Sequence, residues 1–125
     1  MRLHLFEQDV LAEELSEEYD VVTSSLFLHH LEPDDAVGLL RSMRAATRAR
    51  LLIQDLRRTK LGYFFAWVGL HTLTTSTVAR TDGLLSVKAA FTIPEMYELC
   101  REAGLGDASI DSVWPQRMAI RWAPA

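Results

Sequence analysis

The chain has 125 residues, of which 49% are hydrophobic, and its formal net charge is -4 at pH 7. This length and composition predict one globular domain, residues 1–125, with a single hydrophobic core. An acidic chain without a basic stripe is not expected to bind nucleic acid. The one cysteine, Cys100, excludes an internal disulfide and a cysteine metal site, and its apolar surroundings in the sequence predict a buried thiol.

The N-terminal residues do not resemble a signal peptide, because Leu3 to Gln8 alternates apolar and polar side chains. The longest apolar run, Leu61 to Leu73, has about a dozen residues, short of the roughly 20 that span a bilayer. We therefore expect a cytoplasmic protein without a membrane span. The apolar run is expected to form a buried helix, a lid or an interfacial helix.

Strand-like and helix-like segments alternate along the first half of the chain. Leu3 to Gln8 predicts a strand, and Leu11 to Glu18 predicts a short acidic helix. The Val-Val pair in Asp20 to Thr23 predicts a buried strand. Pro33 begins an amphipathic helix with acids in its first turn. Leu51 to Gln54 predicts a second buried strand.

The second half contains one long irregular segment and a closing hairpin. Gly62 to Leu73 predicts an aromatic helix, and Arg80 to Gly83 is predicted to lie in a polar loop of a length that usually covers a site. Thr92 begins another helix with a capping box. Ser109 to Trp114 and Arg117 to Trp122 predict two antiparallel strands with a short connection.

Two motifs carry a resemblance to a known family. They are Phe6-Glu7-Gln8-Asp9-Val10 and the run from Tyr19 to Leu31, which joins a buried strand, a polar strand end and a helix entry. The second resembles the fourth-strand motif of class I S-adenosylmethionine-dependent methyltransferases. A third stretch, RTDGLLSVKAAF at Arg80 to Phe91, resembles one bacterial subgroup of that family. The motifs occur in the family's order and separation, so the resemblance covers the whole chain.

The resemblance implies an α/β protein with a truncated Rossmann-like methyltransferase fold. We expect a mixed, mostly parallel sheet of about five strands that ends in an antiparallel hairpin. Leu3 to Gln8 matches the family's third strand, Asp20 to Thr23 the fourth and Leu51 to Gln54 the fifth. The family's glycine-rich loop and its first two strands have no counterpart. We therefore expect Leu3 to Gln8 to pair directly with Asp20 to Thr23, or another chain to fill the gap by self-association or as a partner.

The resemblance also implies S-adenosylmethionine as the cofactor, bound beyond the carboxyl ends of the strands. Asp9 and Val10 match the family positions that contact adenine. Ser24, Ser25 and Leu26 match the segment that passes the methionine half. Without the resemblance, Asp9 fits better as the cap of the helix predicted after it, and Ser24 and Ser25 suit any strand exit.

His29 and His30 are the candidate catalytic residues. One imidazole could accept a proton from a substrate hydroxyl as the methyl group arrives, and we choose His30 over His29 for this role. Packing at the helix entry is an equally consistent interpretation. We do not expect a metal site, because adjacent side chains diverge and no third ligand shares their spacing.

The acceptor pocket of the family is built from its variable segment, which corresponds here to the stretch after the second buried strand. An aromatic wall there predicts a small hydrophobic or aromatic acceptor, although the same side chains at helical spacing also fit a plain core. The candidate substrate-binding residues are Tyr63, Trp67, Arg80, Lys88 and Phe91, together with Phe64, His71 and Ser86.

Three functions fit these observations. The favoured one is a methyltransferase whose glycine-rich segment lies outside this sequence, with weak cofactor binding by these residues alone. The alternatives are a non-catalytic partner subunit that docks by its open sheet edge, and a small-molecule binding module of the same fold. An in-frame strand and glycine-rich loop upstream of Met1 would identify the first.

Overall fold

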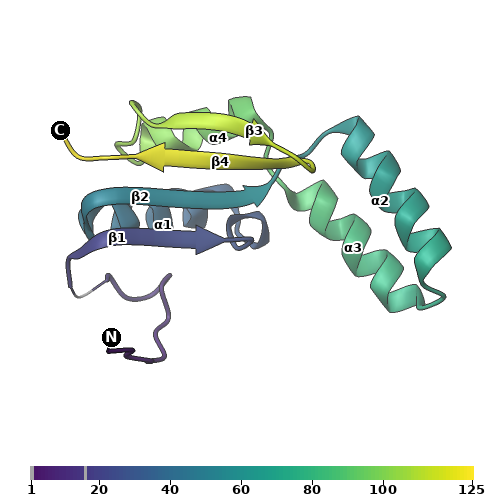
Figure 1. Ribbon diagram of the computed structural model, residues 1–125, viewed down its shortest axis with the longest axis horizontal. Coiled ribbons are helices and arrows are strands. Elements are labelled where there is room, and N and C mark those ends of the chain that lie inside the picture. Colours follow the sequence, from purple (N-terminus) through teal and green to yellow (C-terminus); the bar gives the residue numbers. More distant parts are fainter. Residues whose placement is uncertain (1, 16) are drawn as a thin grey trace.

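The computed structural model describes residues 2–15 and 17–125. Its four strands form one sheet in the order β1-β2-β4-β3 (Figure 1). β1 pairs in parallel with β2, and β4 pairs antiparallel with both β2 and β3. The elements, in chain order, are β1 (Tyr19–Ser25), the single 3-10 turn η1 (Leu28–His30), α1 (Pro33–Ala45), β2 (Thr47–Leu56), α2 (Lys60–Leu73), α3 (Thr77–Ala89), α4 (Ile93–Glu102), β3 (Ser109–Val113) and β4 (Arg117–Trp122).

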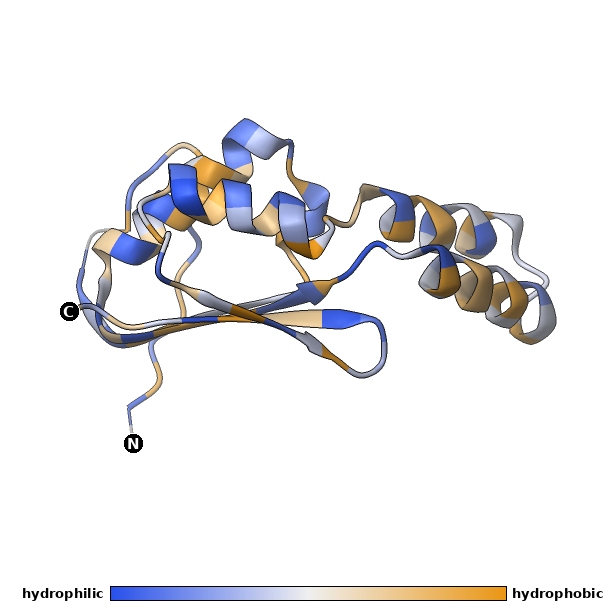
Figure 2. Cartoon of the chain, turned by 90° about the horizontal axis from the view of Figure 1, so that it is seen from above, coloured by the Kyte–Doolittle hydropathy of each residue, from blue (hydrophilic) through white to orange (hydrophobic). Residues whose placement is uncertain are grey.

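The helices α1 and α4 cover one face of the sheet (Figure 2). Side chains alternate along the strands, so Leu51 and Ile53 of β2 are buried under the helices while Leu52 between them is 40% exposed on the open face. The hydrophobic core therefore lies between the covered face of the sheet and the two helices. Its largest fully buried apolar side chains are Leu28, Leu40, Leu51, Ile53, Met96, Leu105, Met118 and Ile120.

Local signals in the sequence set the ends of α1 and α4. Pro33 occupies the first turn of α1, where a missing N–H costs no hydrogen bond. Thr92 and Glu95 form the predicted capping box at the start of α4. Gly104, with φ +82°, follows its end and adopts a conformation that favours glycine. The two predicted strands, the helix at Pro33, the helix at Thr92 and the closing hairpin are confirmed. The strand at Asp20 to Thr23 is, however, an edge strand in which Val22 is buried and Val21 is exposed, so it is not the buried strand that we predicted.

The helices α2 and α3 form a hairpin that extends beyond the end of the sheet (Figures 1 and 2). The side chains of Thr59 and Ser76 cap their first turns. Gly83 permits close packing, since a Cβ there would come within 2.6 Å of the Leu70 Cδ1 atom. The predicted aromatic helix is confirmed as α2, but it is largely exposed rather than buried. Its exposed side chains include Leu61, Phe64, Phe65 and Trp67.

The strand predicted at Leu3 to Gln8 is wrong. Residues 2–9 form no regular structure, and Leu5 is 86% exposed. The alternating pattern stabilises a strand only where a sheet edge accepts its backbone and a core accepts its apolar face. Neither contact forms, so this segment does not pair with β1. The sheet accordingly has four strands instead of five, with one parallel pair instead of a parallel majority.

The short acidic helix predicted at Leu11 to Glu18 is also wrong. The described part of this segment holds one turn over residues 10–12, and Ser16 lies outside the described residues. Glu13 and Glu17 are four residues apart, as are Glu14 and Glu18. Two charges of the same sign at that spacing destabilise a helix.

The polar loop predicted at Arg80 to Gly83 is a helix, because these residues belong to α3. Arg-Thr-Asp-Gly resembles a turn locally, but the glycine here serves the close approach to α2. The thiol of Cys100 is buried as predicted, and burial raises its pKa from 9.0 to about 11. Among the described residues, no helix is both long and apolar enough to cross a membrane.

Candidate functional site

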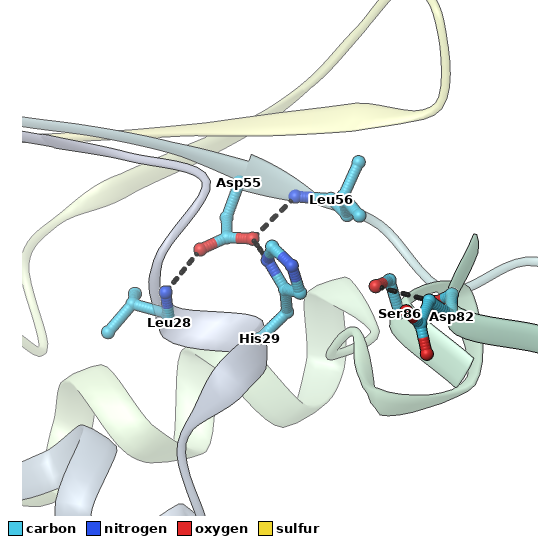
Figure 3. A network of polar contacts seen from close by, with 6 residues as sticks. All are labelled: Leu28, His29, Asp55, Leu56, Asp82 and Ser86. Carbon is cyan, nitrogen blue, oxygen red and sulfur yellow. Dashed lines mark hydrogen bonds and ion pairs between the residues drawn. The ribbon is translucent and has the colours of Figure 1, made fainter. Parts of the chain in front are cut away.

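A buried polar network joins the carboxyl ends of the parallel strands β1 and β2 (Figure 3). Asp55, 1% exposed near the end of β2, is its centre. Its carboxylate accepts the backbone N–H of Leu28 at 2.6 Å and that of Leu56 at 2.7 Å. Its Oδ1 atom also lies 2.6 Å from Nδ1 of His29. Asp55 therefore attaches the η1 turn, which follows β1, to the end of β2.

The partner of Asp55 determines the chemistry of the His29 ring. An ionised carboxylate only accepts hydrogen bonds, so Nδ1 of His29 is the donor. In the neutral ring this leaves the lone pair on Nε2, which is the form of imidazole that accepts protons. His29 is only 6% exposed. It is thus an oriented imidazole held within the protein.

His30 is the exposed member of the pair. Its ring centroid lies 4.0 Å from that of His29, with the two ring planes tilted by 39°. Both rings border a pocket of about 450 Å³ that we call the histidine pocket. It is lined by His29, His30, Leu31, Glu32, Pro33, Arg58, Lys88, Ala89, Phe91 and Glu95. The structure therefore brings both predicted catalytic histidines to one pocket, one buried and one accessible.

The exit of β1 has an unusual backbone. Leu26 has φ +56°, a left-handed conformation that is rare for a bulky side chain, and its N–H donates to the Gln54 carbonyl at 2.9 Å. Such strain persists where neighbouring contacts enforce it, and it is concentrated at functional sites. Ser24 and Ser25, just before it, border a shallow groove of about 290 Å³ on the open face of the sheet. Ser24, Ser25 and Leu26 thus lie at the carboxyl end of β1, and their contact with the methionine half of a cofactor stays a prediction.

Asp9 and Val10 lie elsewhere. The Asp9 side chain accepts the N–H groups of Leu11 and Ala12 at 3.0 and 3.3 Å, so it caps a turn. Val10 lines a separate pocket against α1. The segment hangs beneath the start of β1 in Figure 1, away from the end of the strand. The described chain thus does not bring Asp9 and Val10 together with Ser24.

Three of the predicted acceptor residues gather beside the histidines. Lys88 and Phe91 line the histidine pocket. The Nζ atom of Lys88 also lies 5.5 Å from the centroid of the Tyr63 ring, within range of a cation–π interaction. Phe91 is 8% exposed and belongs to the core, so its role is at least partly structural.

The remaining predicted acceptor residues lie elsewhere on the α2–α3 hairpin. Trp67 is 47% exposed and stacks on His71 with ring centroids 4.4 Å apart. Arg80 donates to the carbonyls of Thr74 and His71, which stabilises the connection between the two helices. Phe64 is exposed on α2, and Ser86 Oγ donates to a carbonyl one turn earlier in α3. These side chains do not line the histidine pocket.

Asp55 is the residue of the candidate site that the sequence analysis did not single out. Its sequence signal is an acidic residue inside a buried strand, directly after Leu51 to Gln54. A charged side chain at a buried position is rarely found without a partner. That rule alone would have marked Asp55, but only the fold identifies His29 as its partner. Among the described residues, no cluster of three or more candidate metal ligands was found.

Comparison with known proteins establishes the fold. No family model and no curated protein matches the chain. A solved structure of PigF with SAH matches 94% of this chain and 34% of its own, with 18% identity and a TM-score of 0.62. An O-methyltransferase family protein from Burkholderia thailandensis matches 93% and 34%, with 16% identity and a TM-score of 0.60.

Magnesium protoporphyrin IX methyltransferase (ChlM) from Synechocystis PCC 6803 with bound SAH matches 94% of this chain and 49% of its own, with 14% identity and a TM-score of 0.58. The chain therefore spans between a third and a half of the length of these structures. Likeness at these identities shows the fold alone. The predicted resemblance is confirmed at that level: the chain has part of a class I methyltransferase fold.

Proposed function

We propose that the chain is the acceptor-side part of an S-adenosylmethionine-dependent methyltransferase acting on the hydroxyl group of a small hydrophobic or aromatic molecule. The observation that carries this proposal is the His29–Asp55 pair at the carboxyl ends of two parallel strands. Open α/β sheets bind their ligands at that edge. The matching structures of PigF and ChlM, which contain SAH, support the choice of cofactor.

In this proposal His30 is the general base, because its ring is exposed in the histidine pocket. It accepts the proton of the acceptor hydroxyl on a ring nitrogen. His29 is a positioning residue. Its bond to Asp55 fixes the η1 turn, and contact with the tilted His29 ring then holds His30 in place. Methyl transfer needs few side-chain steps, because alignment of the reacting atoms supplies much of the rate enhancement.

The residues present fit one side of the cofactor. Ser24 and Ser25 form a small-residue strand exit beside a groove of about 290 Å³, where a backbone can approach a ligand closely, and the strained Leu26 follows them. S-adenosylmethionine, when bound, supplies a methyl group on an already activated sulfonium. The proposed adenine contacts of Asp9 and Val10 require residues 2–12 to swing toward the end of β1.

Titration of the chain with S-adenosylhomocysteine, followed by amide NMR, tests the cofactor site. With contacts on one side only, we expect an affinity near millimolar, about 4 kcal/mol of binding free energy. The amide shifts should be concentrated at Ser24, Ser25 and Leu26. The absence of shifts at saturating ligand would refute the proposed function. Loss of affinity in Asp9→Ala supports the adenine contact, and an unchanged affinity removes that contact from the proposal.

Turnover in a form of the protein that methylates a hydroxyl acceptor tests the base. His30→Gln should lower kcat by roughly 100-fold or more, because the proton acceptor is lost. His71→Gln is the matched control, since His71 is an exposed histidine on the outer part of α2. Wild-type turnover in His30→Gln would return His30 to a structural role. Acceptor binding without cofactor binding would favour the alternative of a small-molecule binding module.

A further inference from the structure

A second groove lies at the base of the α2–α3 hairpin. It has a volume of about 460 Å³, within the range of sites for small organic ligands. We call it the lysine groove, because Lys60 and Lys88, the two lysines of the chain, both line it. Arg58, Tyr63 and Val87 complete most of its wall.

The lysine groove is cationic in an acidic protein. Three basic side chains line it and no acidic one does, although the chain has a net charge of -4. The Arg58 guanidinium is already paired with the Glu95 carboxylate. Lys60 and Lys88 form no ion pair with any described residue. The groove therefore presents two ammonium groups without a counter-charge.

The rest of the wall is aromatic and apolar. The Tyr63 ring forms one side with the Lys88 Nζ atom 5.5 Å from its centroid, and Val87 and the aliphatic stems of the lysines extend the apolar surface. A flat apolar body can lie on such a surface while its charged end meets the ammonium groups. A neutral molecule would fill the same surface but leave both charges unpaired.

The groove adjoins the histidine pocket. Arg58 and Lys88 line both, so a ligand long enough to pass these two side chains would reach toward His30. We propose that the methyl acceptor is an aromatic carboxylic acid whose carboxylate binds between Lys60 and Lys88, with its reactive hydroxyl directed toward the histidine pocket. That the bound acid is the methyl acceptor rests on the proposed function. That the ligand carries a carboxylate rests on the lysine groove alone.

The test compares two flat probes of the same shape, 2-naphthoate and neutral 2-naphthamide, titrated into the chain without cofactor. Exposed charge pairs contribute modestly, so we expect naphthoate to bind roughly 5- to 10-fold more tightly at low salt. The preference should disappear as salt rises from about 0.05 M to about 0.5 M, because ions screen the pairs. Equal affinities at low salt would overturn the proposal.

Variants assign the preference to the groove. Lys60→Met with Lys88→Met keeps the apolar stems and should bring the naphthoate preference to about one. Arg48→Met with Arg101→Met removes the same charge from exposed sites outside the groove and should retain it. Both lysines are exposed, so folding should tolerate their replacement. A preference that survives in the lysine variant would also overturn the proposal.

The result is separable from the proposed function. Naphthoate preference without any binding of S-adenosylhomocysteine would refute the methyltransferase and leave an anion-binding groove. Binding of S-adenosylhomocysteine without a preference for naphthoate would refute only the inference that the acceptor is a carboxylic acid.

Discussion

The Asp55 carboxylate accepts the backbone N–H of Leu28 at 2.6 Å, although the two residues are 27 positions apart in the sequence. The end of β2 thereby holds the turn that follows β1. The same carboxylate accepts from Leu56 and from Nδ1 of His29, so one side chain satisfies three donors in a dry environment. The candidate site is thus part of the structural framework of the sheet.

Asp55→Asn should therefore lower stability as well as function. The amide keeps one oxygen but turns a donor toward groups that donate, which leaves buried N–H groups unpaired. We expect a loss of roughly 2 to 3 kcal/mol in the free energy of unfolding. Urea denaturation measures it. Asp111→Asn is the control, because Asp111 is exposed and weakly paired with Arg121 at 3.7 Å; an equal loss in both variants would contradict the role of the network.

Leu26→Gly should lower stability less than Phe27→Gly does, although both variants lose a side chain of similar exposure. The left-handed backbone of Leu26 costs about 1 to 2 kcal/mol, and relief of that strain offsets the roughly 0.5 to 1 kcal/mol that glycine costs through the unfolded chain. Phe27→Gly, at a neighbour of similar exposure with φ -122°, should lose about 1 kcal/mol or more. Equal losses in the two variants would show that Leu26 is not strained.

Cys100 should react slowly in the folded chain. Burial raises its thiol pKa from 9.0 to about 11, so the reactive thiolate is scarce at about pH 8. Alkylation by iodoacetamide should be on the order of 100-fold slower than in urea, and faster than expected labelling would show that α4 opens. Because folding raises the pKa of this thiol, burial of its neutral form contributes to the free energy of unfolding. That contribution is complete below about pH 9 and is lost as pH rises through about 11.

The outer edge of β1 should promote self-association. β1 is an edge strand whose outer side pairs with no described residue, and Val21 on it is 53% exposed. Light scattering should show an apparent mass that rises with concentration, and Val21→Lys should suppress the rise. Val78→Lys places the same change on the exposed surface of α3 and should not. A monomer at all concentrations would refute this prediction.

Several elements are determined by short stretches of sequence alone. Pro33 with its acidic neighbours starts α1, the Thr92 capping box starts α4, and the Val-Val pair marks β1. Each of these signals acts through backbone groups or side chains within a few residues, so no distant partner is needed to interpret it. The fold family also follows from the segment at Tyr19 to Leu31, which is continuous in the chain.

Only the tertiary structure decided the rest. Leu3 to Gln8 has the pattern of a strand but finds no sheet edge, and Arg80 to Gly83 has the pattern of a turn but packs as a helix on Leu70. The pairing of His29 with Asp55 joins residues 26 positions apart. Strand pairing, helix packing and buried hydrogen bonds all depend on which distant surface becomes the neighbour, and a local pattern cannot specify that surface.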